Sequence, residues 1–425
     1  MIVITGGGWG GCAAAFSAAR AGAKVILLEK TDMLLGTGLV GGIMRNNGRF
    51  TATEEACVMG AGDFFGLIDK VSRHRNINFP GHKHATLYDV TMIEPVIREA
   101  LQQLNVEIRF FTRVTGVNKK GQEIKSLVTA KGEEIVGDAF IDTTGSAGPV
   151  QNCTKYGSGC AMCILRCPSF GPRVSVTAKA GIKEIRAGEG FPHFEAMSGS
   201  CKLDKKSLAP ELVNKLERDG VLVCPLPAEF HKGDILNRKA CQQYALADYA
   251  SNLIILDTGH AKIMTPFFPL ETLRQLRGFE NARYADPYSG GKGNSIRFMA
   301  LAPCDDSLRV TGCENLFCAG EKTGLLVGHT EAIVTGFLAG HNAVRYLSGK
   351  ALTVLPTETV IGDLINFMHK EMKSPSGLEK KYTFSGSVYY QRMQDLNLYS
   401  TDLAEIKKRV QLAGVEQLFN QKYKL

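Results

Sequence analysis

The sequence lacks the features that would make it a membrane or secreted protein. No apolar run in its 425 residues approaches the length of a membrane-spanning helix. Met1 leads directly into an apolar strand, which leaves no room for a signal peptide, so we expect a cytoplasmic location. Internal repeats and low-complexity tracts are missing as well. These absences leave a globular chain that is long enough for two or more domains with cores of their own.

The net charge excludes fewer classes of protein than the chain length and the apolar runs do. The formal net charge is +8, and the basic residues are spread along the chain. Such a balance is typical of an ordinary basic enzyme, but it also suits an anionic partner, either a nucleic acid or a polyanionic cofactor. The 12 cysteines argue against a disulfide framework in a cytoplasmic chain, and they favour thiol chemistry, a metal or simple burial.

The first thirty residues have the pattern of a strand, a glycine turn, a helix and a second strand that ends in an acid. Within such a turn the first glycine permits the tight bend, the second lets the backbone approach a pyrophosphate, and the third lets the helix lie close to the strand. The helix N-terminus offers N–H groups and a positive dipole end to the phosphates. The terminal acid can accept hydrogen bonds from ribose hydroxyls. We therefore expect these residues to bind a dinucleotide: Gly6, Gly8, Trp9, Gly10, Gly11, Glu29 and Lys30.

Further along the chain, hydrophobic spacing predicts helices at 92–104 and 331–347 and strands at 106–111, 113–117, 138–142, 221–223, 253–256 and 315–318. We expect a glycine-rich loop at 34–43 and an irregular insertion at 49–90. The pattern predicts an α/β fold with a doubly wound parallel sheet, interrupted by a mixed α+β substrate domain and followed by a small helical layer. The expected boundaries are 1–150 and 301–350 for the nucleotide domain, 151–300 for the substrate domain and 351–425 for the helices.

Several stretches resemble the glucose-inhibited division protein A family and its smaller relatives, the folate-dependent tRNA uracil-methylating flavoproteins. The opening VITGGGWGGCAAAFSAARAGAKVILLE and the segment NLFCAGEKTGLLVGHTEAIVTGFLAGHNAVR at 315–345 are similar to that family's first and closing flavin segments. Residues 273–298, the Cys-Pro-Ser element at 167–169 and PTETVIGDLINFM at 356–368 extend the likeness. One departure is Glu321, which stands where those enzymes usually have glutamine.

The resemblance implies a two-dinucleotide-binding-domain FAD-dependent oxidoreductase in which hydride passes through flavin N5. Its leading substrate is uridine in RNA, with a folate one-carbon donor, so the expected anionic partners are RNA and folate. A second strand–glycine turn–helix unit is missing, and any NAD(P)H would therefore bind transiently at the flavin face. An oligomer is compatible with the sequence. Further residues are expected at the cofactor: Gly36, Thr37, Gly41, Gly42, Arg45, Val114, Thr144, Gly145, Gly320, Glu321, Gly328, His329 and Thr330.

Chemistry beyond the cofactor is expected at His329 and at a cysteine cluster, and three interpretations of the cluster stay open. Its thiolates could hold an iron–sulfur cluster or zinc, as in a small-molecule dehydrogenase or an electron-transfer flavoprotein. Cys160, Cys163 or Cys167 could instead form a redox dithiol or attack C6 of a uracil, with Arg166 lowering the thiolate pKa. The third interpretation is simple burial. The metal-binding set would be Cys153, Cys160, Cys163 and Cys167.

Overall fold

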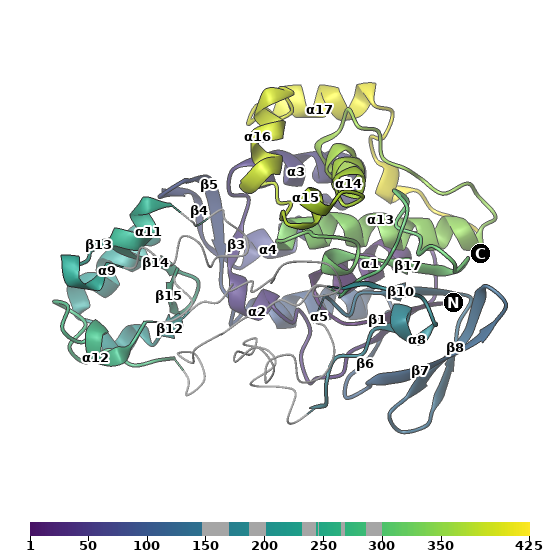
Figure 1. Cartoon of the computed structure of the whole chain (residues 1–425), viewed down its shortest axis with the longest axis horizontal. Coiled ribbons are helices and arrows are strands. Elements are labelled where there is room, and N and C mark those ends of the chain that lie inside the picture. The colour runs from purple at the N-terminus through teal and green to yellow at the C-terminus, as the bar shows by residue number, and fades with distance from the viewer. Residues whose placement is uncertain (147–169, 187–200, 232–243, 245, 265–267, 286–299) are drawn as a thin grey trace.

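A five-stranded parallel sheet forms the centre of the computed structural model (Figure 1), which describes the chain except for residues 147–169, 187–200, 232–243, 245, 265–267 and 286–299. The strand order is β17-β10-β1-β2-β6, and every neighbouring pair is parallel. The carboxyl ends of the strands therefore share one edge, where ligands of open α/β sheets bind. The strands are β1 (Ile2–Thr5), β2 (Val25–Leu28), β6 (Glu107–Arg109), β10 (Ala139–Asp142) and β17 (Leu316–Cys318).

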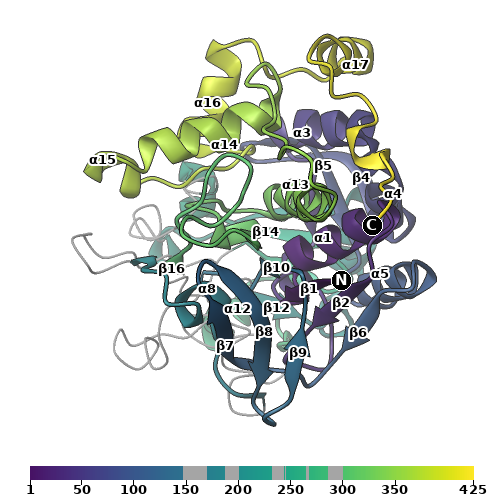
Figure 2. The same cartoon turned by 90° about the vertical axis from the view of Figure 1, so that its right-hand side faces the viewer.

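The two faces of this sheet are covered differently. Helices α1 (Trp9–Arg20), α5 (Ile93–Gln103) and α13 (His329–Leu347) pack on one face and form the larger hydrophobic core. The other face packs against a three-stranded antiparallel sheet and a short helix, whose side chains form a second core (Figure 2). This layer consists of β7 (Val114–Lys120), β8 (Glu123–Thr129), β9 (Glu134–Val136) and α8 (Val176–Lys179). The predicted nucleotide-binding fold is confirmed.

Helices α1 and α13 lie in parallel and very close together. A Cβ on Gly336 would lie 2.4 Å from the Gly10 carbonyl oxygen, and a Cβ on Gly340 would lie 2.4 Å from that of Ala14. Because successive contacts run in the same direction along both helices, their N-termini point towards the same edge of the sheet. Small residues on both helices make this approach possible, and they bring two positive dipole ends to the ligand-binding edge.

The expectation of an irregular insertion at 49–90 is wrong. This region forms helices α3 and α4, joined by one π-helical turn, and then a β-hairpin whose turn contains Pro80 and Gly81. The buried face of α3 carries polar side chains that bind the C-terminal layer: Thr51 donates to the Ser400 carbonyl at 2.7 Å, and Glu55 pairs with Arg409 at 3.1 Å. Hydrophobic periodicity is consequently weak there. The elements are α3 (Gly48–Ala56), η1 (Cys57–Ala61), α4 (Gly62–Lys70), β3 (Ile43–Met44), β4 (Ser72–Phe79) and β5 (His82–Tyr88).

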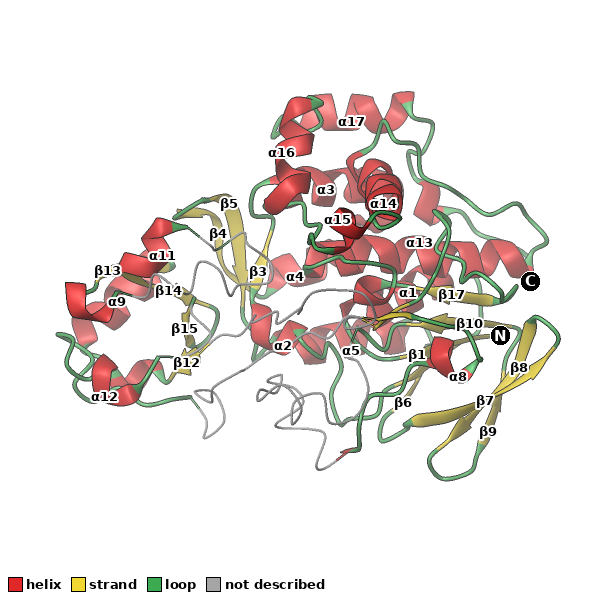
Figure 3. Cartoon of the chain, viewed as in Figure 1, coloured by secondary structure: helices red, strands yellow, loops and turns green. Residues whose placement is uncertain are grey.

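The inserted domain has its own antiparallel sheet and its own core, on the left of Figure 3. The strand order is β12-β15-β14-β13, and both strands predicted from the sequence, 221–223 and 253–256, are present. The strands are β12 (Cys201–Leu203), β13 (Val221–Pro225), β14 (Asn252–Asp257) and β15 (Ala261–Ile263), with β11 (Ile185–Arg186) and β16 (Ala300–Leu301) pairing separately. The helices are α9 (Pro210–Asp219), α11 (Ala247–Ser251) and α12 (Leu270–Leu273), with 3-10 turns η2 (Lys205–Ser207) and η3 (Ala228–Phe230).

The C-terminal residues form the predicted helical layer over α3 and α13, at the top of Figure 1. The chain then returns to the first helix, since the Tyr423 amide donates to the Ala21 carbonyl at 3.0 Å. Within the part of the chain that the structure describes, no helix has the length and apolar character needed to cross a membrane. The elements are α14 (Val360–Glu371), α15 (Pro375–Leu378), α16 (Ser387–Asp395), α17 (Leu403–Leu412) and η5 (Leu418–Asn420).

Candidate functional site

The glycine turn between β1 and α1 has the close packing that its sequence predicts. Gly6 has φ +105°, a left-handed conformation that glycine adopts without a steric penalty. A Cβ on Gly11 would lie 1.9 Å from the Gly6 carbonyl oxygen, so only glycine lets α1 begin this close to the strand. Thr143 at the end of β10 donates to the Gly6 carbonyl, which fixes the turn against the neighbouring strand.

Gly8 differs from its neighbours because nothing lies within 4 Å of the position that its Cβ would occupy. Gly8 is the N-cap of α1, and the first turn of that helix contains no acidic side chain. The first N–H groups of a helix have no partner within the helix itself, and they carry the positive end of its dipole. An open space beside these donors has the chemistry of a pyrophosphate site.

Glu29 at the end of β2 is buried and already anchored to the glycine turn. Its Oε2 accepts from the Gly7 amide at 2.7 Å, and its Oε1 accepts from the Thr31 amide and hydroxyl, both at 2.9 Å. A carboxylate offers about four lone-pair sites, so roughly one remains for a ribose hydroxyl. Together with the open side of Gly8, this donor and acceptor set fits the nucleotide half of a dinucleotide cofactor.

The return segment after β17 lies against the glycine turn between β1 and α1. A Cβ on Gly10 would lie 3.3 Å from the Gly320 amide nitrogen, and Gly320 itself has φ +68°. The amide of Gly320 donates to the Thr335 hydroxyl at 2.9 Å, which ties η4 (Gly320–Lys322) to α13. Glu321 accepts a hydrogen bond from the Ser146 hydroxyl at 2.9 Å.

The glycine-rich loop contains one helical turn, α2 (Gly38–Gly41), where we expected no helix. The start of this loop lies over the glycine turn between β1 and α1, because a Cβ on Gly36 would be 3.9 Å from the Gly8 Cα. Thr37 is the N-cap of α2, and Gly42 ends it with φ +78°. A Cβ on Gly41 would overlap the His329 ring, so the loop lies directly against the start of α13.

His329 lies among aromatic side chains at the N-terminus of α13. Its ring centroid is 6.3 Å from that of Trp9 and 6.3 Å from that of Tyr88. The Tyr88 hydroxyl donates to the Gly38 carbonyl at 2.6 Å and therefore accepts from Nδ1 of His329 at 3.2 Å. Burial raises the pKa of Tyr88, which keeps its hydroxyl protonated. No sequence motif pointed to Tyr88.

Other predicted cofactor residues have partners elsewhere. The Arg45 guanidinium binds Asp69 and Glu54, and the Lys30 ammonium donates to the Gly171 carbonyl at 2.8 Å. Val114 is buried in the core between the two sheets. The Thr144 hydroxyl donates to Asp142 at 2.7 Å, in front of Gly145 with φ +76°. Direct contacts of these residues with a cofactor stay a prediction.

A buried ion pair below the start of α13 was missed by sequence reasoning. Glu331 accepts from the Arg49 Nε through both carboxylate oxygens, at 3.1 and 3.0 Å, and also from the Thr383 hydroxyl at 2.7 Å. The side chains are 4% and 0% exposed, so neither charge is solvated by bulk water. Gly328 with φ +145° fits between these side chains, and Thr330 is buried beside Met44. The pair connects α3, α13 and the C-terminal layer, which no local pattern reveals.

A second buried network holds the end of β10. Both oxygens of Asp142 accept hydrogen bonds, from Thr144 on one side and from the amide and hydroxyl of Thr177 at 2.8 and 2.7 Å on the other. The Lys322 ammonium beside it pairs with Glu184 and donates to the Ala300 carbonyl. These bonds connect η4 to the inserted domain. The cysteine cluster proposed for metal or redox chemistry, Cys153, Cys160, Cys163 and Cys167, lies outside the described residues.

Family models match the two segments that build this site. Residues 2–149 match the FAD dependent oxidoreductase model, and residues 263–351 match the glucose inhibited division protein A model. A methylenetetrahydrofolate–tRNA-(uracil-5-)-methyltransferase TrmFO of Thermosipho melanesiensis is 35% identical over 99 residues, covering 23% of this chain and 22% of that protein. The tRNA uridine 5-carboxymethylaminomethyl modification enzyme MnmG of Desulfotalea psychrophila is 36% identical over 98 residues, covering 23% and 14%. The matches thus span about a fifth or less of these relatives.

Solved structures support the fold. The form II crystal structure of Aquifex aeolicus GidA matches with a TM-score of 0.65 at 17% identity, over 97% of this chain and 73% of that one. The form I crystal structure of the same protein gives a TM-score of 0.59, also at 17% identity, over 97% and 78%. At this identity the likeness is one of architecture, and it covers both the nucleotide domain and the inserted domain.

Proposed function

We propose that this chain, which belongs to the FAD-dependent oxidoreductases related to the glucose-inhibited division protein A, binds FAD at the carboxyl edge of its sheet and modifies uridine in RNA with a folate one-carbon donor. The observation that supports it most is the open space at Gly8, which adjoins the first turn of α1 and the anchored carboxylate of Glu29. Both lie within the segment that the FAD dependent oxidoreductase model matches.

The chain offers a group for each part of FAD. The first amides of α1 would hold the pyrophosphate, Glu29 the ribose, and the loop of α2 with the start of α13 the ring. Bound FAD would supply a two-electron carrier that takes up and releases hydride. The positive end of α13 would stabilise negative charge near its N-terminus.

Within this site, His329 is the side chain that we propose exchanges a proton with the substrate. The hydrogen bond of its Nδ1 to Tyr88 sets the tautomer and orients the ring. Trp9, Phe64 and Tyr88 surround this end of α13 with apolar surface, and the Trp9 ring contacts the other two edge-on. These aromatic side chains give the space beside His329 apolar walls, which strengthens its electrostatic interactions.

RNA as the substrate rests on the names of the relatives and on charge. The TrmFO and MnmG relatives, matched over 99 and 98 residues, are tRNA-modifying enzymes by name. A net charge of +8 suits a phosphate-rich partner, whose binding weakens steeply as salt rises because bound counterions are released. We therefore expect tRNA binding at low ionic strength that declines linearly on a double-logarithmic salt plot.

Labelled folate provides the test. The purified chain is incubated with unmodified tRNA transcript, NADH and methylenetetrahydrofolate carrying ¹³C in its one-carbon unit, and the nucleosides are analysed by mass spectrometry. We expect a uridine that carries the label. Absence of labelled uridine, together with absence of tRNA binding at low salt, would refute the RNA proposal, while FAD titration checks the cofactor separately.

An electron-transfer flavoprotein with an iron–sulfur cluster at Cys153–Cys167 is the alternative. The relatives do not favour it, since their names refer to uridine modification. Iron and sulfide analysis of anaerobically purified protein separates the two functions, because a stoichiometric cluster would support the electron carrier.

A further inference from the structure

A cluster of two cysteines, a histidine and an aspartate lies on the side of β17 away from the glycine turn. Cys304 follows β16, Cys318 ends β17, and His369 and its partner Asp306 connect α14 to this region. We call these four residues the Cys304 cluster. None of them was expected to be functional from the sequence, and the proposed uridine chemistry does not use them.

Hydrogen bonds show that both ring nitrogens of His369 are donors. Nδ1 faces the Asp306 carboxylate at 2.8 Å, and Nε2 faces the Thr323 carbonyl at 3.2 Å. A carboxylate and a carbonyl are both acceptors, so a neutral imidazole would point one lone pair at another. The second Asp306 oxygen accepts from Asn366 at 2.7 Å, which holds the carboxylate in place. The arrangement therefore fits an imidazolium cation.

This cation lies beside the Cys304 sulfur. The distance from Sγ to Nε2 of His369 is 3.6 Å, and the same sulfur lies 3.4 Å from the Thr323 carbonyl oxygen, to which it donates while it keeps its proton. The neighbouring Cys318 thiol and the nearby imidazolium together outweigh burial and the opposing charge of Asp305, and they lower the pKa of Cys304 to about 6. Although burial opposes its charge, hydrogen bonds to Asp306 and Cys304 raise the pKa of His369 to about 10.

The pKa of Cys318 shifts in the opposite direction. Burial, the neighbouring Cys304 and the charge of Asp142 raise its pKa, and Lys322 opposes them only in part. The Cys318 thiol donates to the Leu308 carbonyl at 3.7 Å, so this sulfur keeps its proton, and Cys304 is the sulfur of the pair that ionises. This division of roles is found in dithiols in which one sulfur attacks and the other resolves.

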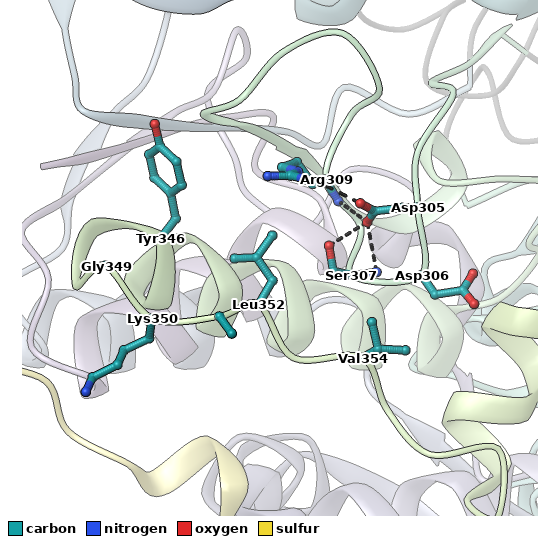
Figure 4. A pocket seen from close by; sticks show the side chains of 10 residues that line it. Asp305, Asp306, Ser307, Arg309, Tyr346, Gly349, Lys350, Leu352 and Val354 are labelled. Carbon is teal, nitrogen blue, oxygen red and sulfur yellow. Dashed lines mark hydrogen bonds and ion pairs between the residues drawn. The ribbon is translucent and has the colours of Figure 1, made fainter.

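Small molecules can approach the cluster from the surface. Cys304 is partly exposed, and the side chains of His369 and Asp306 are 13% and 25% exposed. An open pocket of about 560 Å³ adjoins the cluster at Asp306, whose carboxylate turns away from Arg309 in Figure 4. Tyr346, Leu352 and Val354 form much of its other wall.

We propose that Cys304 is the attacking thiolate of a redox dithiol site and that Cys318 is its resolving thiol, with hydrogen peroxide as the oxidant. The Cys304 sulfur attacks one peroxide oxygen, the O–O bond breaks, and two electrons pass from sulfur to oxygen. The leaving hydroxide takes a proton and departs as water. The Cys318 sulfur then attacks the Cys304 sulfenic acid, an S–S bond forms, and a second water leaves. Two thiols and one peroxide thus yield one disulfide and two waters.

The first test is the pH profile of alkylation by iodoacetamide, followed peptide by peptide with mass spectrometry on the full chain. We expect the Cys304 rate to be half-maximal near pH 6. Cys224 is the matched control, since it is partly exposed and burial raises its pKa. At pH 6, Cys304 should react roughly twentyfold faster than Cys224, because thiolate fraction outweighs the lower intrinsic nucleophilicity.

Variants of His369 and Asp306 test whether these two residues position and stabilise the Cys304 thiolate or only support the fold. His369→Gln and Asp306→Asn should each shift the Cys304 midpoint upward, while the Cys224 rate and the melting temperature stay near those of the parent chain. A Cys304 midpoint above pH 8 in the parent chain, or equal rates for the two thiols at pH 6, would overturn the proposal.

The second test uses peroxide itself. After stoichiometric hydrogen peroxide and blocking of the remaining thiols, digestion should release a peptide pair joined through Cys304 and Cys318. In Cys318→Ser, the Cys304 sulfenic acid should persist and be trapped by a 1,3-diketone probe. Oxidation that leaves Cys304 unlinked to Cys318 in the parent chain would refute the resolving role. Neither readout depends on FAD or RNA, so this proposal can fail independently of the proposed function.

Discussion

Helices α1 and α13 begin side by side at the same edge of the sheet, but they are built in opposite ways. The start of α1 depends on glycines that approach the backbone of β1, and its first turn carries no acidic side chain. The start of α13 contains the buried carboxylate of Glu331, which Arg49 from a distant helix neutralises. Further along α13 lies a second buried ionisable group, His341.

The difference separates two ways of preparing a helix N-terminus for a ligand. Helix α1 keeps its positive end open for an external anion, in a site made of backbone atoms. Helix α13 is held in place by side chains that must stay paired, so its position depends on long-range electrostatics. Changes at the open side of Gly8 should therefore affect cofactor affinity, and changes at the buried ionisable groups of α13 should affect stability and its dependence on pH.

The largest effect is expected from Arg49→Ala. This change leaves the Glu331 carboxylate buried without a counterion, which should lower the free energy of unfolding by about 3–5 kcal/mol. Denaturant unfolding measures it. As a control, the double variant Arg49→Met with Glu331→Met removes both charges and should recover a large part of that loss. A single variant as stable as the parent would show that the pair is not needed to hold α13.

His341 should make stability depend on pH. Neither of its ring nitrogens has a hydrogen-bond partner among the described residues, and burial with the nearby Arg345 lowers its pKa to about 4. The unfolded chain binds this proton below pH 6.5, so stability is full above that pH and falls as pH drops towards 4, by on the order of 3 kcal/mol in all.

Replacement of the His341 imidazole tests whether this group causes the loss of stability between pH 6.5 and pH 4. In His341→Phe, the loss of stability between pH 6.5 and pH 4 should be smaller than in the parent, because no proton is taken up at this position on unfolding. Thermal melts across that range measure the slope. His231→Gln removes an exposed histidine and is the control for the loss of an imidazole. An unchanged slope in His341→Phe would contradict a buried neutral histidine.

A smaller loss of stability is expected where α1 approaches the Gly6 carbonyl. Gly11→Ala places a Cβ against the Gly6 carbonyl and should destabilise the fold by about 2–3 kcal/mol through overpacking. Gly66→Ala in α4 is the matched control, because nothing lies within 4 Å of its Cβ position and alanine favours a helix. Equal melting temperatures for the two variants would mean that α1 can move away from the strand.

The smallest change in the free energy of unfolding is expected at Gly8. The same substitution should nevertheless weaken the binding of FAD. The added methyl group of Gly8→Ala enters open space, so folding should change by less than about 1 kcal/mol. The same methyl group occupies the place that we assign to the pyrophosphate, and FAD affinity should fall about tenfold, or about 1.4 kcal/mol. Fluorescence titration with FAD measures it. Unchanged affinity would place the phosphates elsewhere.

Local sequence determined the parts of this protein that depend on backbone conformation and periodicity. Gly6 and Gly11 predicted the turn, because no other residue fits the left-handed bend or the close approach. The apolar run at 2–4 and the strand pattern at 138–142 predicted parallel strands, and the spacing at 331–347 predicted α13. These features could be predicted from the sequence because each depends on neighbours within a few residues.

Only the tertiary structure decided which distant side chains meet. Helix α3 escaped prediction because its buried positions are polar and find their partners more than 280 residues away, as Arg49 does in Glu331. Cys304, Cys318 and His369 are ordinary in the sequence, and they gain their chemistry only when β17 and α14 bring them together. The ionisation of a buried acid or thiol is set by the groups that desolvate and neutralise it, and in this fold those groups lie on other secondary-structure elements.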